Sequence, residues 1–303
     1  MGLDPLTTDK IKLSSPGQNR YNRWMIDDES FQLSESRIDN ETNADTGILE
    51  LPRPTPEYEI IQGDCLKIVP TIAKETVNVI FADPPYYLSN GGTTCKNGKR
   101  AKVNKGQWDS SKGIEADHRF HHAWLSQCQR VLKPNGTIWI TATHHTLFLI
   151  GYAMQQLGFK ILNLVTWEKP NPPPNLSCKS FTHSTEMLIW AAKNSESKHK
   201  FNYGDMRAEN NGKQMKTVWQ FKAPRNGEKL HGKHPTQKPL ALIDRCLLAS
   251  SSVGDLILDP FAGSGSTGVS AVSLGRCFIG VESNPGYCTL ALNRILGASS
   301  LIS

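Results

Sequence analysis

Long apolar segments are absent from this sequence of 303 residues. An apolar run such as residues 147–153 is far shorter than the roughly 20 residues that a membrane-spanning helix needs. The polar and acidic start of the chain contains no apolar stretch of the kind that a secretory signal requires. Hydrophobic residues make up 38% and charged residues 20% of the chain, which is typical of a globular protein. We therefore expect a cytoplasmic protein with no membrane partner.

Cysteine pairs with metal-binding or redox spacing are also absent. The seven cysteines are scattered, their number is odd, and no two stand in a C-x-x-C arrangement. Reduced thiols explain this pattern better than a disulfide framework or a zinc site. Two groups of neighbouring histidines, at 118–122 and 144–145, raise the question of a metal site. Because no cysteine or carboxylate pattern completes a ligand set there, we predict no metal.

The charges are distributed unevenly along the chain. Residues 1–57 contain six basic and eleven acidic residues, whereas residues 58–303 contain 28 basic and 17 acidic residues. The first segment has few periodic apolar positions and ends in the proline-rich run Leu51–Pro56, so we expect an acidic, flexible extension with a linker. The basic remainder has the electrostatic character of a protein that binds a polyanion.

From residue 58 onward, short apolar segments alternate with helical patterns. The sequence predicts strands at 58–62, 77–82, 137–141, 162–167, 186–192, 256–258 and 278–281. It predicts helices at 66–73, 118–131, 147–157, 240–250, 266–274 and 287–296. This alternation indicates one α/β domain over residues 58–303, with a mainly parallel, twisted sheet and helices on both of its faces.

A glycine-rich segment, Asp259–Gly268, follows a short predicted strand and opens a predicted helix. Its glycines allow a ligand to approach the backbone, and the start of the helix offers free N–H groups. Glu282 ends the next predicted strand, where folds of this type bind ribose hydroxyls. The pair favours an adenosine-type ligand, although a plain tight turn and a surface carboxylate would look similar.

A second segment, Asp83–Tyr86, has the sequence Asp-Pro-Pro-Tyr and follows the predicted strand 77–82. Each residue that precedes a proline is excluded from the helical region, so this segment is extended and rigid. It lies at the carboxyl edge of the sheet, where α/β proteins bind ligands. A turn after a strand is the simpler interpretation, but a carboxylate, two fixed carbonyls and an aromatic ring favour a binding role.

Together these segments resemble motifs of the amino-methyltransferases. Asp83–Tyr86 looks like the catalytic motif, and Asp259–Gly265 looks like the S-adenosylmethionine loop. Further matches occur at residues 63–66, 130–136, 181–186 and 234–240. The catalytic motif comes first and the cofactor loop last, an order that resembles the permuted β class of adenine-N6 DNA methyltransferases of restriction–modification systems. The resemblance covers about residues 58–297.

The resemblance implies a Rossmann-like methyltransferase fold with a circularly permuted motif order and an inserted target-recognition region. The implied activity is site-specific transfer of a methyl group from S-adenosylmethionine to the N6 amine of adenine, with the base flipped out of the duplex. The implied catalytic residues are Asp83, Pro84, Pro85 and Tyr86. The implied cofactor-binding residues are Asp64, Cys65, Asp83, Thr236, Lys238, Asp259, Phe261, Ala262, Gly263, Ser264 and Glu282.

Several of these residues have a more specific implied role. The Asp83 carboxylate and the Pro84 carbonyl would accept the hydrogens of the target amine, and Tyr86 would stack on the base. Glu282 would bind the cofactor ribose. Thr236 with Lys238 would bind the methionine carboxylate, and Asp64 with Cys65 would lie beside the cofactor adenine.

Two basic segments are candidates for the DNA-facing surface. The first is a mobile loop at about 88–110, and the second is the target-recognition region at about 193–233. Their candidate DNA-binding residues are Lys96, Lys99, Arg100, Lys102, Lys105, Lys213, Lys216, Lys222 and Arg225. Such side chains mostly hold phosphates, while a few reach base edges. Solvated basic loops would have the same composition.

Alternatives remain open at this point. Methylation of N4-cytosine uses the same pocket chemistry, protein glutamine methylation uses a related motif, and a non-catalytic nucleic-acid-binding module could retain the fold. The runs 83–92, 171–178 and 211–219 resemble those of the second methyltransferase in GATC-recognising systems, which also accepts single-stranded DNA. A homodimer and a cognate restriction endonuclease acting on the same site are further expectations.

Overall fold

The computed structural model describes residues 12–14, 56–89, 93–96, 99–102, 109–224, 228 and 237–300, with only the backbone described at 12–14, 93–96 and 99–102. Within these residues, one sheet has the strand order β1-β2-β11-β10-β3-β6-β8-β7-β9, and β4 and β5 form a separate hairpin. The strands are β1 (Lys12–Ser14), β2 (Tyr58–Gln62), β3 (Val77–Ala82), β4 (Thr93–Lys96), β5 (Lys99–Lys102), β6 (Leu132–Ala142), β7 (Lys160–Glu168), β8 (Thr185–Ala192), β9 (Val218–Gln220), β10 (Leu256–Asp259) and β11 (Cys277–Glu282). The helices are α1 (Cys65–Ile68), the 3-10 helix η1 (Val69–Thr71), α2 (Ile114–Val131), α3 (Leu147–Gln156), α4 (Tyr203–Glu209), α5 (Leu240–Ser250), α6 (Ser266–Ser273) and α7 (Pro285–Ser299).

The centre of the sheet is parallel. Strands β2, β11, β10, β3 and β6 pair with one another in the parallel sense, whereas β8 runs antiparallel between β6 and β7. The central strand β3 is almost entirely buried, which explains its continuous apolar sequence. The prediction of a mainly parallel α/β fold is confirmed.

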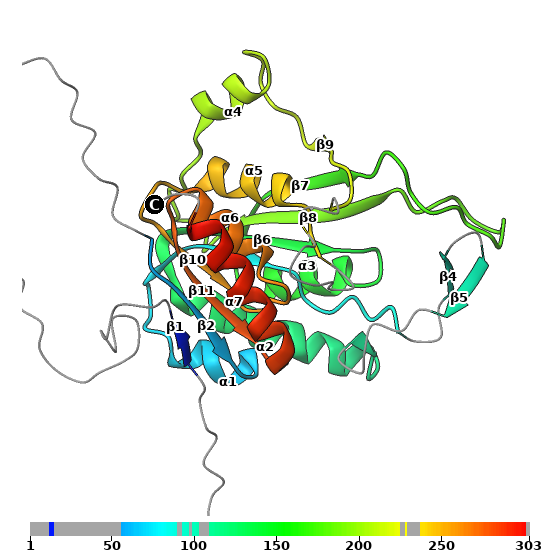
Figure 1. Cartoon of the computed structure of the whole chain (residues 1–303), viewed down its shortest axis with the longest axis horizontal. Helices are drawn as coiled ribbons and strands as arrows, with labels where there is room; N and C mark the ends of the chain where they lie inside the picture. Colours follow the sequence, from blue (N-terminus) through cyan, green and yellow to red (C-terminus); the bar gives the residue numbers. More distant parts are fainter. Residues whose placement is uncertain are drawn as a thin grey trace, which may run out of the picture.

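Helices cover both faces of the sheet (Figure 1). On β3, Ile80 packs in the core layer under α1, α2 and α3, whereas Val79 and Phe81 pack in the layer under α5, α6 and α7. The second layer also contains stacked Trp139 and Trp190, whose ring centroids are 4.9 Å apart. The alternation of inward positions along each strand therefore supports two separate cores.

The chain leaves the sheet in opposite directions at β3 and β10. From β3 it passes through α2 to reach β6 on one side, and from β10 it passes through α6 to reach β11 on the other. Such a switch point opens a crevice beyond the carboxyl ends of the two strands. Asp83 directly follows β3 and Asp259 ends β10, so both motifs meet at this crevice.

Some elements differ from those expected from the sequence. The helix predicted at 66–73 is divided into α1 and η1, because Pro70 lacks the N–H group that a continuous helix requires. The helix α2 begins at Ile114, four residues before the predicted start. In β6, residues 133–136 are extra residues opposite Asn78, since Leu132 pairs with Val77 and Thr137 pairs with Val79.

Regular structure that the sequence did not indicate occurs in two segments, one before the predicted domain and one in its basic loop. Residues 12–14 form β1, which pairs antiparallel with β2, while most of the predicted extension 1–57 lies outside the described residues. Strands β4 and β5 form a hairpin within the predicted basic loop, away from the main sheet (Figure 1). The domain boundaries themselves stay a prediction.

The predicted target-recognition region packs against the domain at two places. Asn202, which precedes α4, donates from Nδ2 to the carbonyl oxygens of Leu248 and Ser251 at the end of α5. Strand β9 extends the sheet by pairing with β7, and its Trp219 is buried against Trp139. This region is therefore tied both to a helix and to the edge of the sheet.

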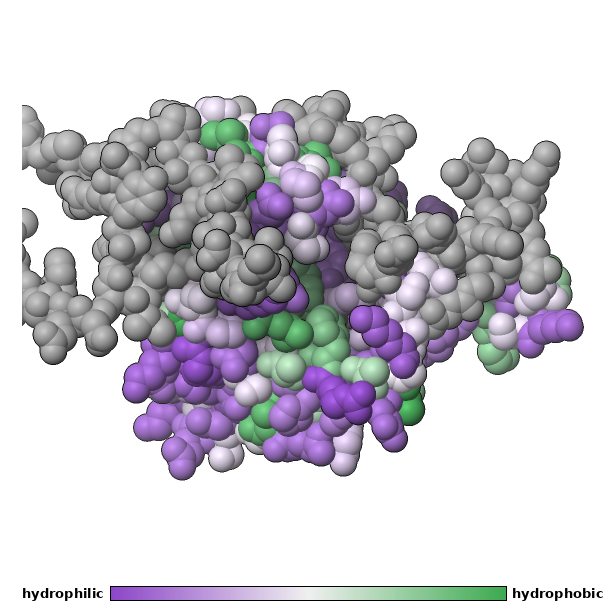
Figure 2. Space-filling model, turned by 90° about the horizontal axis from the view of Figure 1, so that it is seen from below, coloured by the Kyte–Doolittle hydropathy of each residue, from purple (hydrophilic) through white to green (hydrophobic). Residues whose placement is uncertain are grey.

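The described surface is mixed in character. On the side shown in Figure 2 it is mostly hydrophilic, with smaller apolar patches among the polar residues. No helix within the described part of the chain combines the length and the apolar character that crossing a membrane requires.

Candidate functional site

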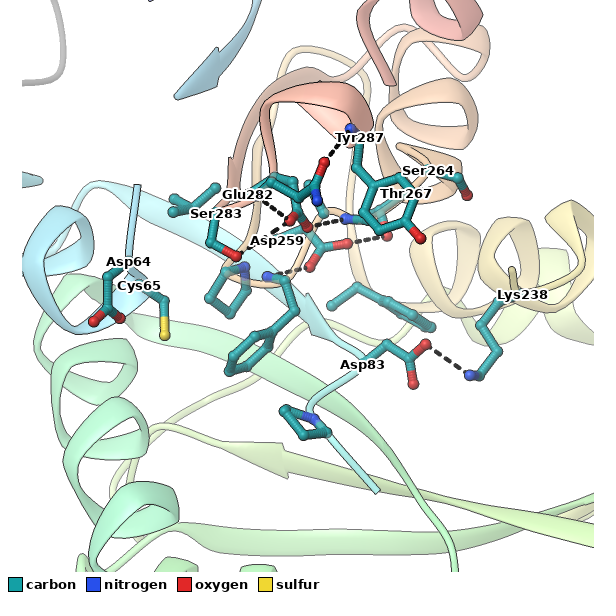
Figure 3. A pocket seen from close by; sticks show the side chains of 18 of the residues that line it. Asp64, Cys65, Asp83, Lys238, Asp259, Ser264, Thr267, Glu282, Ser283 and Tyr287 are labelled. Carbon is teal, nitrogen blue, oxygen red and sulfur yellow. Dashed lines mark hydrogen bonds and ion pairs between the residues drawn. The ribbon is translucent and has the colours of Figure 1, made fainter. Parts of the chain in front are cut away.

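A cavity of about 540 Å³ occupies the switch-point crevice, a size usual for small-molecule sites. Its wall is formed by the β2–α1 turn, the end of β3, the first turns of α2, the segment before α5, the β10–α6 loop and the β11–α7 turn. Figure 3 shows Asp64 and Cys65 at one end and Asp83 and Lys238 at the other, with Asp259 and Glu282 between them. The cavity is thus elongated and has acidic groups along its length.

The glycine-rich segment forms one long wall. Asp259 accepts hydrogen bonds from the Phe261 N–H (2.9 Å) and the Thr267 hydroxyl (2.6 Å), which bind the loop to the first turns of α6. Gly263 and Gly265 have φ values of +53° and +73°, in the region that glycine tolerates best. A Cβ atom at Gly265 would also lie 2.7 Å from the Ala291 Cβ on α7. These two glycines are therefore required by the backbone itself.

Glu282 connects this loop to the neighbouring strand. Its Oε2 accepts from the Gly263 N–H (2.9 Å), and its Oε1 accepts from the Asn284 N–H (2.7 Å). Asn284 caps α7 by accepting from the backbone N–H groups of Gly286 and Tyr287. The carboxylate is thereby fixed at the cavity wall by two backbone donors.

Asp259 is the most deeply buried acid of the cavity, with 3% of its surface exposed. Burial raises the pKa of Asp259 to about 7, against the opposing effect of its two hydrogen bonds. The carboxyl group therefore changes its charge near neutral pH, in the loop that shapes the cavity.

The far end of the cavity is formed by the start of α1. The Asp64 side chain caps this helix by accepting from the Leu66 N–H (2.9 Å). Burial, together with the neighbouring Asp64 carboxylate, raises the pKa of the Cys65 thiol to about 12. Cys65 is therefore a neutral thiol at neutral pH, which makes it a poor nucleophile.

At the opposite end, Asp83 is held by two side chains. Its Oδ2 accepts from the Lys238 ammonium group (2.7 Å), and its Oδ1 accepts from the Thr141 hydroxyl on β6. The Lys238 side chain is 6% exposed and the Asp83 side chain 18% exposed, so this ion pair is largely shielded from water. These two partners therefore fix the orientation of the carboxylate.

A second buried acid, Glu186 at the start of β8, completes this network. Its Oε2 accepts from the Tyr86 hydroxyl (3.2 Å) and lies 3.7 Å from the Lys238 Nζ atom, and its Oε1 is paired with Lys169. The Lys238 ammonium also lies 4.9 Å from the centre of the Tyr86 ring. Two lysines and two acids thus alternate around Tyr86.

The charges of this network stabilise one another. Burial alone would lower the pKa of Lys238, but the carboxylates of Asp83 and Glu186 raise it above its ordinary value. Burial alone would raise the pKa of Glu186, but Lys238 and Lys169 lower it below its ordinary value. Both groups are therefore ionised at neutral pH, and each depends on the other for its charge.

The structure brings most of the predicted site residues together. Those that line the cavity are Asp64, Cys65, Asp83, Pro85, Lys238, Asp259, Phe261, Ala262, Gly263, Ser264 and Glu282. Pro84 and Tyr86 are buried beside it, and Thr236 lies outside the described residues. The neighbouring Tyr87 lines the cavity, whereas Tyr86 is 5% exposed. Stacking of Tyr86 on a base stays a prediction.

Several residues of the cavity and the network were missed from the sequence, among them Asp109, Asp117, Phe120 and Glu186. Asp117 and Phe120 on α2 line the cavity, Asp109 binds the backbone after Tyr86, and Glu186 binds its hydroxyl. Glu186 belongs to the matched run 181–186, so that motif was the one signal for it. Asp109 is at the end of the basic segment 88–110, Asp117 and Phe120 follow that segment, and none of the three carried a recognisable pattern.

The predicted DNA-binding residues fall into two groups. Lys213, Lys216 and Lys222 are exposed in the region between α4 and α5. Those outside the residues with described side chains are Lys96, Lys99, Arg100, Lys102, Lys105 and Arg225.

The sequence matches the model of a protein family described as DNA methylase over residues 77–293. It is 48% identical to the Type II methyltransferase M2.MboI of Moraxella bovis, over 78% of this chain and 87% of that protein. It is also 48% identical to the Type II methyltransferase M2.DpnII of Streptococcus pneumoniae, over 78% of this chain and 88% of that protein. The chain belongs to the DNA methylase family. The predicted family and enzyme class, a DNA methyltransferase of restriction–modification type, are confirmed.

Solved structures agree with the fold of this DNA methylase. The M1.HpyAVI–SAM complex has a TM-score of 0.60 and 27% identity, covering 78% of this chain and 98% of that one. The cytosine-N4-specific PvuII DNA methyltransferase has a TM-score of 0.63 and 17% identity, covering 82% of this chain and 93% of that one. At 17% identity the second likeness concerns the fold alone, and the predicted methyltransferase fold is confirmed.

Proposed function

We propose that this DNA methylase transfers the methyl group of S-adenosylmethionine to the N6 amine of adenine in DNA. The observation that supports this most directly is the position of Asp83. Its carboxylate is oriented by Lys238 and Thr141 at one end of an elongated cavity, opposite the glycine-rich wall. A hydrogen-bond acceptor for the target amine and a site for the methyl donor thus share one cavity.

The residues of the cavity fit S-adenosylmethionine. Asp64 and Cys65 provide a polar and an apolar contact for an adenine ring, and Glu282 presents a fixed carboxylate to ribose hydroxyls. The positive φ at Gly263 leaves the backbone open to a ligand where a side chain would intrude. When bound, the cofactor supplies an electrophilic methyl group on a positively charged sulfur. The acidic lining favours such a charge.

Lys238 has a more complex position than the predicted contact with a methionine carboxylate. Its ammonium group is bound to Asp83 and lies beside Glu186. Because Lys238 also lines the cavity, it stands between Asp83 and the space in which the cofactor would bind. We assign Lys238 the role of connecting Asp83, at the acceptor end of the cavity, with the carboxylate of the bound cofactor.

Asp83 acts on the acceptor base. The lone pair of an exocyclic amine is delocalised into the purine ring, which makes the nitrogen a poor nucleophile. When the Asp83 carboxylate and the Pro84 carbonyl accept the two amine hydrogens, the lone pair is localised on nitrogen and directed at the methyl group. Alignment of the two reactants supplies much of the rate, and the base must first be flipped out of the duplex.

Adenine rather than cytosine is the proposed target because the motif has Asp at position 83. Base-resolution mapping of a methylated plasmid library tests this choice. We expect N6-methyladenine at one short sequence in DNA treated with the wild-type protein and none in DNA treated with Asp83→Ala. N4-methylcytosine in place of N6-methyladenine would support the alternative activity.

The proposed recognition sequence is GATC, with activity on single-stranded as well as duplex DNA. The support is the resemblance of the runs 83–92, 171–178 and 211–219 to the second methyltransferase of GATC-recognising systems. An unpaired adenine also avoids the cost of extrusion, which is a few kcal/mol. A cognate endonuclease would act on the same sequence, and a homodimer is a further proposal.

Transfer rates on matched oligonucleotides test both parts of this proposal. We expect methylation of single-stranded and duplex GATC oligonucleotides and little methylation of scrambled ones. Equal rates on GATC and scrambled sequences would contradict the target. Strict dependence on a duplex would contradict the single-strand activity.

The proposed DNA-binding surface consists of the basic segment 88–110 and the exposed lysines between α4 and α5. The first segment follows β3 at the carboxyl edge of the sheet, where the cavity opens, and the second leads through β9 to the start of α5 beside the cavity. Replacing Lys99, Arg100 and Lys102 by glutamine should reduce the log–log slope of DNA affinity against salt by about 0.9 for each lost phosphate contact. Substitution of Lys74 and Lys160, which are exposed at the amino edge of the sheet, is the matched control. Equal slopes for the two variants would mean that the basic side chains of the segment are solvated and do not contact phosphates.

A further inference from the structure

Asp109 is an acid that the proposed chemistry does not use, and it is almost fully buried, with 1% of its surface exposed. It lies 23 residues after Tyr86 and directly precedes the residues that lead into α2. Burial of a carboxylate requires strong hydrogen bonds or a cation, so its partners indicate its purpose.

The partners of Asp109 are in the segment that follows the Asp-Pro-Pro-Tyr motif. Its Oδ1 accepts from the Tyr86 N–H (3.0 Å), and its Oδ2 accepts from the Leu88 N–H (3.0 Å) and the Ser89 hydroxyl (3.0 Å). Its carbonyl oxygen also accepts from the Ser89 N–H (3.2 Å). One side chain therefore binds three of the four residues 86–89, in the segment that leaves the catalytic motif.

The motif has few other means of fixing its backbone. Strand β3 ends at Ala82, and Pro84 and Pro85 have no N–H group to donate. The first N–H group available after these prolines is that of Tyr86, which is the group that Asp109 accepts. The rigid motif is thus anchored at the first position where anchoring is chemically possible.

The residue between the two bonded amides is strained. Tyr87 has a φ of +57°, in the left-handed region that bulky residues rarely occupy. This conformation directs the chain so that Tyr87 lines the cavity while Tyr86 is buried against Glu186. A strained backbone persists only where its surroundings fix it, and Asp109 binds the amides on both sides of Tyr87.

We propose that Asp109 is a positioning residue for methyl transfer, whose carboxylate holds the backbone after Asp83 in the conformation that the acceptor base requires. The inference rests on the proposed function of the same site. Asp109 does not contact the acceptor amine or the cofactor in this role. It acts through the backbone of Tyr86 and Leu88, on which the orientation of the Asp-Pro-Pro-Tyr motif depends.

The test is Asp109→Asn, which keeps the size of the side chain but leaves one acceptor oxygen in place of two. We expect the single-turnover rate of methyl transfer to fall roughly tenfold to a hundredfold, since small misplacements of reacting groups have effects of this size. The dissociation constant for S-adenosylmethionine should stay within about threefold of wild type. A wild-type transfer rate, or an equal loss of rate and cofactor affinity, would overturn the assignment.

Asp255→Asn is the matched control. Asp255 precedes β10 at the amino edge of the sheet and accepts from the Ser252 N–H (2.7 Å) and the Asn78 Nδ2 (2.7 Å). It therefore also uses both carboxylate oxygens, but far from the cavity. The control should leave the transfer rate within about threefold of wild type. If Asp255→Asn lowered the transfer rate as much as Asp109→Asn does, the rate would fall because of lower stability and not because of the position of Asp109.

Two further measurements separate the inference from the proposed function. Hydrogen exchange of the Tyr86 and Leu88 amides should be faster in Asp109→Asn than in wild type, and unchanged exchange would overturn the role of Asp109. The exchange measurement does not depend on activity. If the wild-type protein modified no adenine, the proposed function would be contradicted, but the exchange result would still test the role of Asp109. In a Tyr87→Gly background, where the left-handed strain is relieved, the loss from Asp109→Asn should be smaller. Strictly additive losses would also overturn the assignment.

Discussion

The acids on the two sides of the cavity are held by different kinds of partner. On the glycine-rich side, Asp259 and Glu282 accept hydrogen bonds from backbone N–H groups and a hydroxyl. On the acceptor side, Asp83 is paired with the buried Lys238 ammonium group and Glu186 with the partly buried Lys169 ammonium group. The first arrangement fixes the shape of a loop, and the second fixes the charge of the acids.

This difference matches the two tasks that we propose for the site. A loop that encloses a cofactor has to present its backbone, so its acids are used to bind backbone groups. A carboxylate that accepts from a neutral amine must stay ionised in a site largely closed to water, so it needs a cation close by. We therefore expect the acceptor side to be sensitive to the loss of an ion-pair partner. We expect the glycine-rich side to be sensitive to a change of backbone conformation or of pH.

The largest expected effect comes from Asp83→Ala. Loss of an oriented acceptor of this kind should reduce the transfer rate by about 10³-fold. Affinity for S-adenosylmethionine should change by less than about tenfold, or 1.4 kcal/mol, because in the proposed mechanism Asp83 contacts the target amine. Single-turnover kinetics and equilibrium binding measure the two quantities. A wild-type transfer rate in Asp83→Ala would show that Asp83 takes no part in methyl transfer.

Lys238→Met should lower the free energy of unfolding by about 3 kcal/mol, because Asp83 and Glu186 would lose their shared partner in a buried site. The control is Lys193→Met, whose partner Glu75 has a side chain that is 48% exposed. We expect a loss below about 1 kcal/mol there. Urea unfolding measures both, and equal losses would show that the lysines of the acceptor side have no special role in the charge network.

Gly263→Val should weaken binding of S-adenosylmethionine roughly tenfold to a hundredfold, since a β-branched residue at a φ of +53° displaces the loop. Gly254→Val is the matched control, because Gly254 has a φ of +82° and open space around its Cβ position in a turn remote from the cavity. It should lower stability but leave cofactor affinity unchanged. Titration calorimetry measures the affinity of both variants for S-adenosylmethionine. Similar affinities would show that the loop at Gly263 does not contact the cofactor.

The smallest expected effect concerns pH. Burial raises the pKa of Asp259 to about 7, well above the value of the unfolded chain, so the folded state binds the proton more tightly. Stability from this group is therefore fully present only below the unfolded pKa of about 4, and is lost as the pH rises from there through 7, with about 1 kcal/mol of the loss between pH 6 and pH 8. Asp259→Asn should lack this component. Identical pH dependence of unfolding in the two proteins would contradict the raised pKa.

The sequence allowed the two walls of the cavity to be predicted because each is a contiguous motif. Asp83–Tyr86 is made rigid by its own prolines, and Asp259–Gly265 is shaped by its own glycines, so local chemistry specifies both. The order of strands and helices from residue 58 was predicted for the same reason, since each element has its own periodicity.

The partners of these motifs could not be predicted in the same way. Asp109 is 23 residues from Tyr86, and Glu186 is 100 residues from it, so only the tertiary fold brings them together. The elements α4 and β9 were missed because they are short and depend on contacts with α5 and β7. Short elements of this kind obtain their stability from packing, which leaves little trace in their own sequence.

The strand order has a consequence for how the protein folds. Strands β10 and β11, from residues 256–282, lie between β2 and β3, which are close in sequence, and Ile257 pairs with Val79 across 178 positions. During synthesis β2 and β3 emerge long before the two strands that separate them, so their edges remain unpaired until late. Unpaired edges invite pairing with other chains, and pairings so distant in sequence form slowly. The centre of the sheet is therefore completed last. The cavity at the switch point forms only when β10 and β11 have paired between β2 and β3.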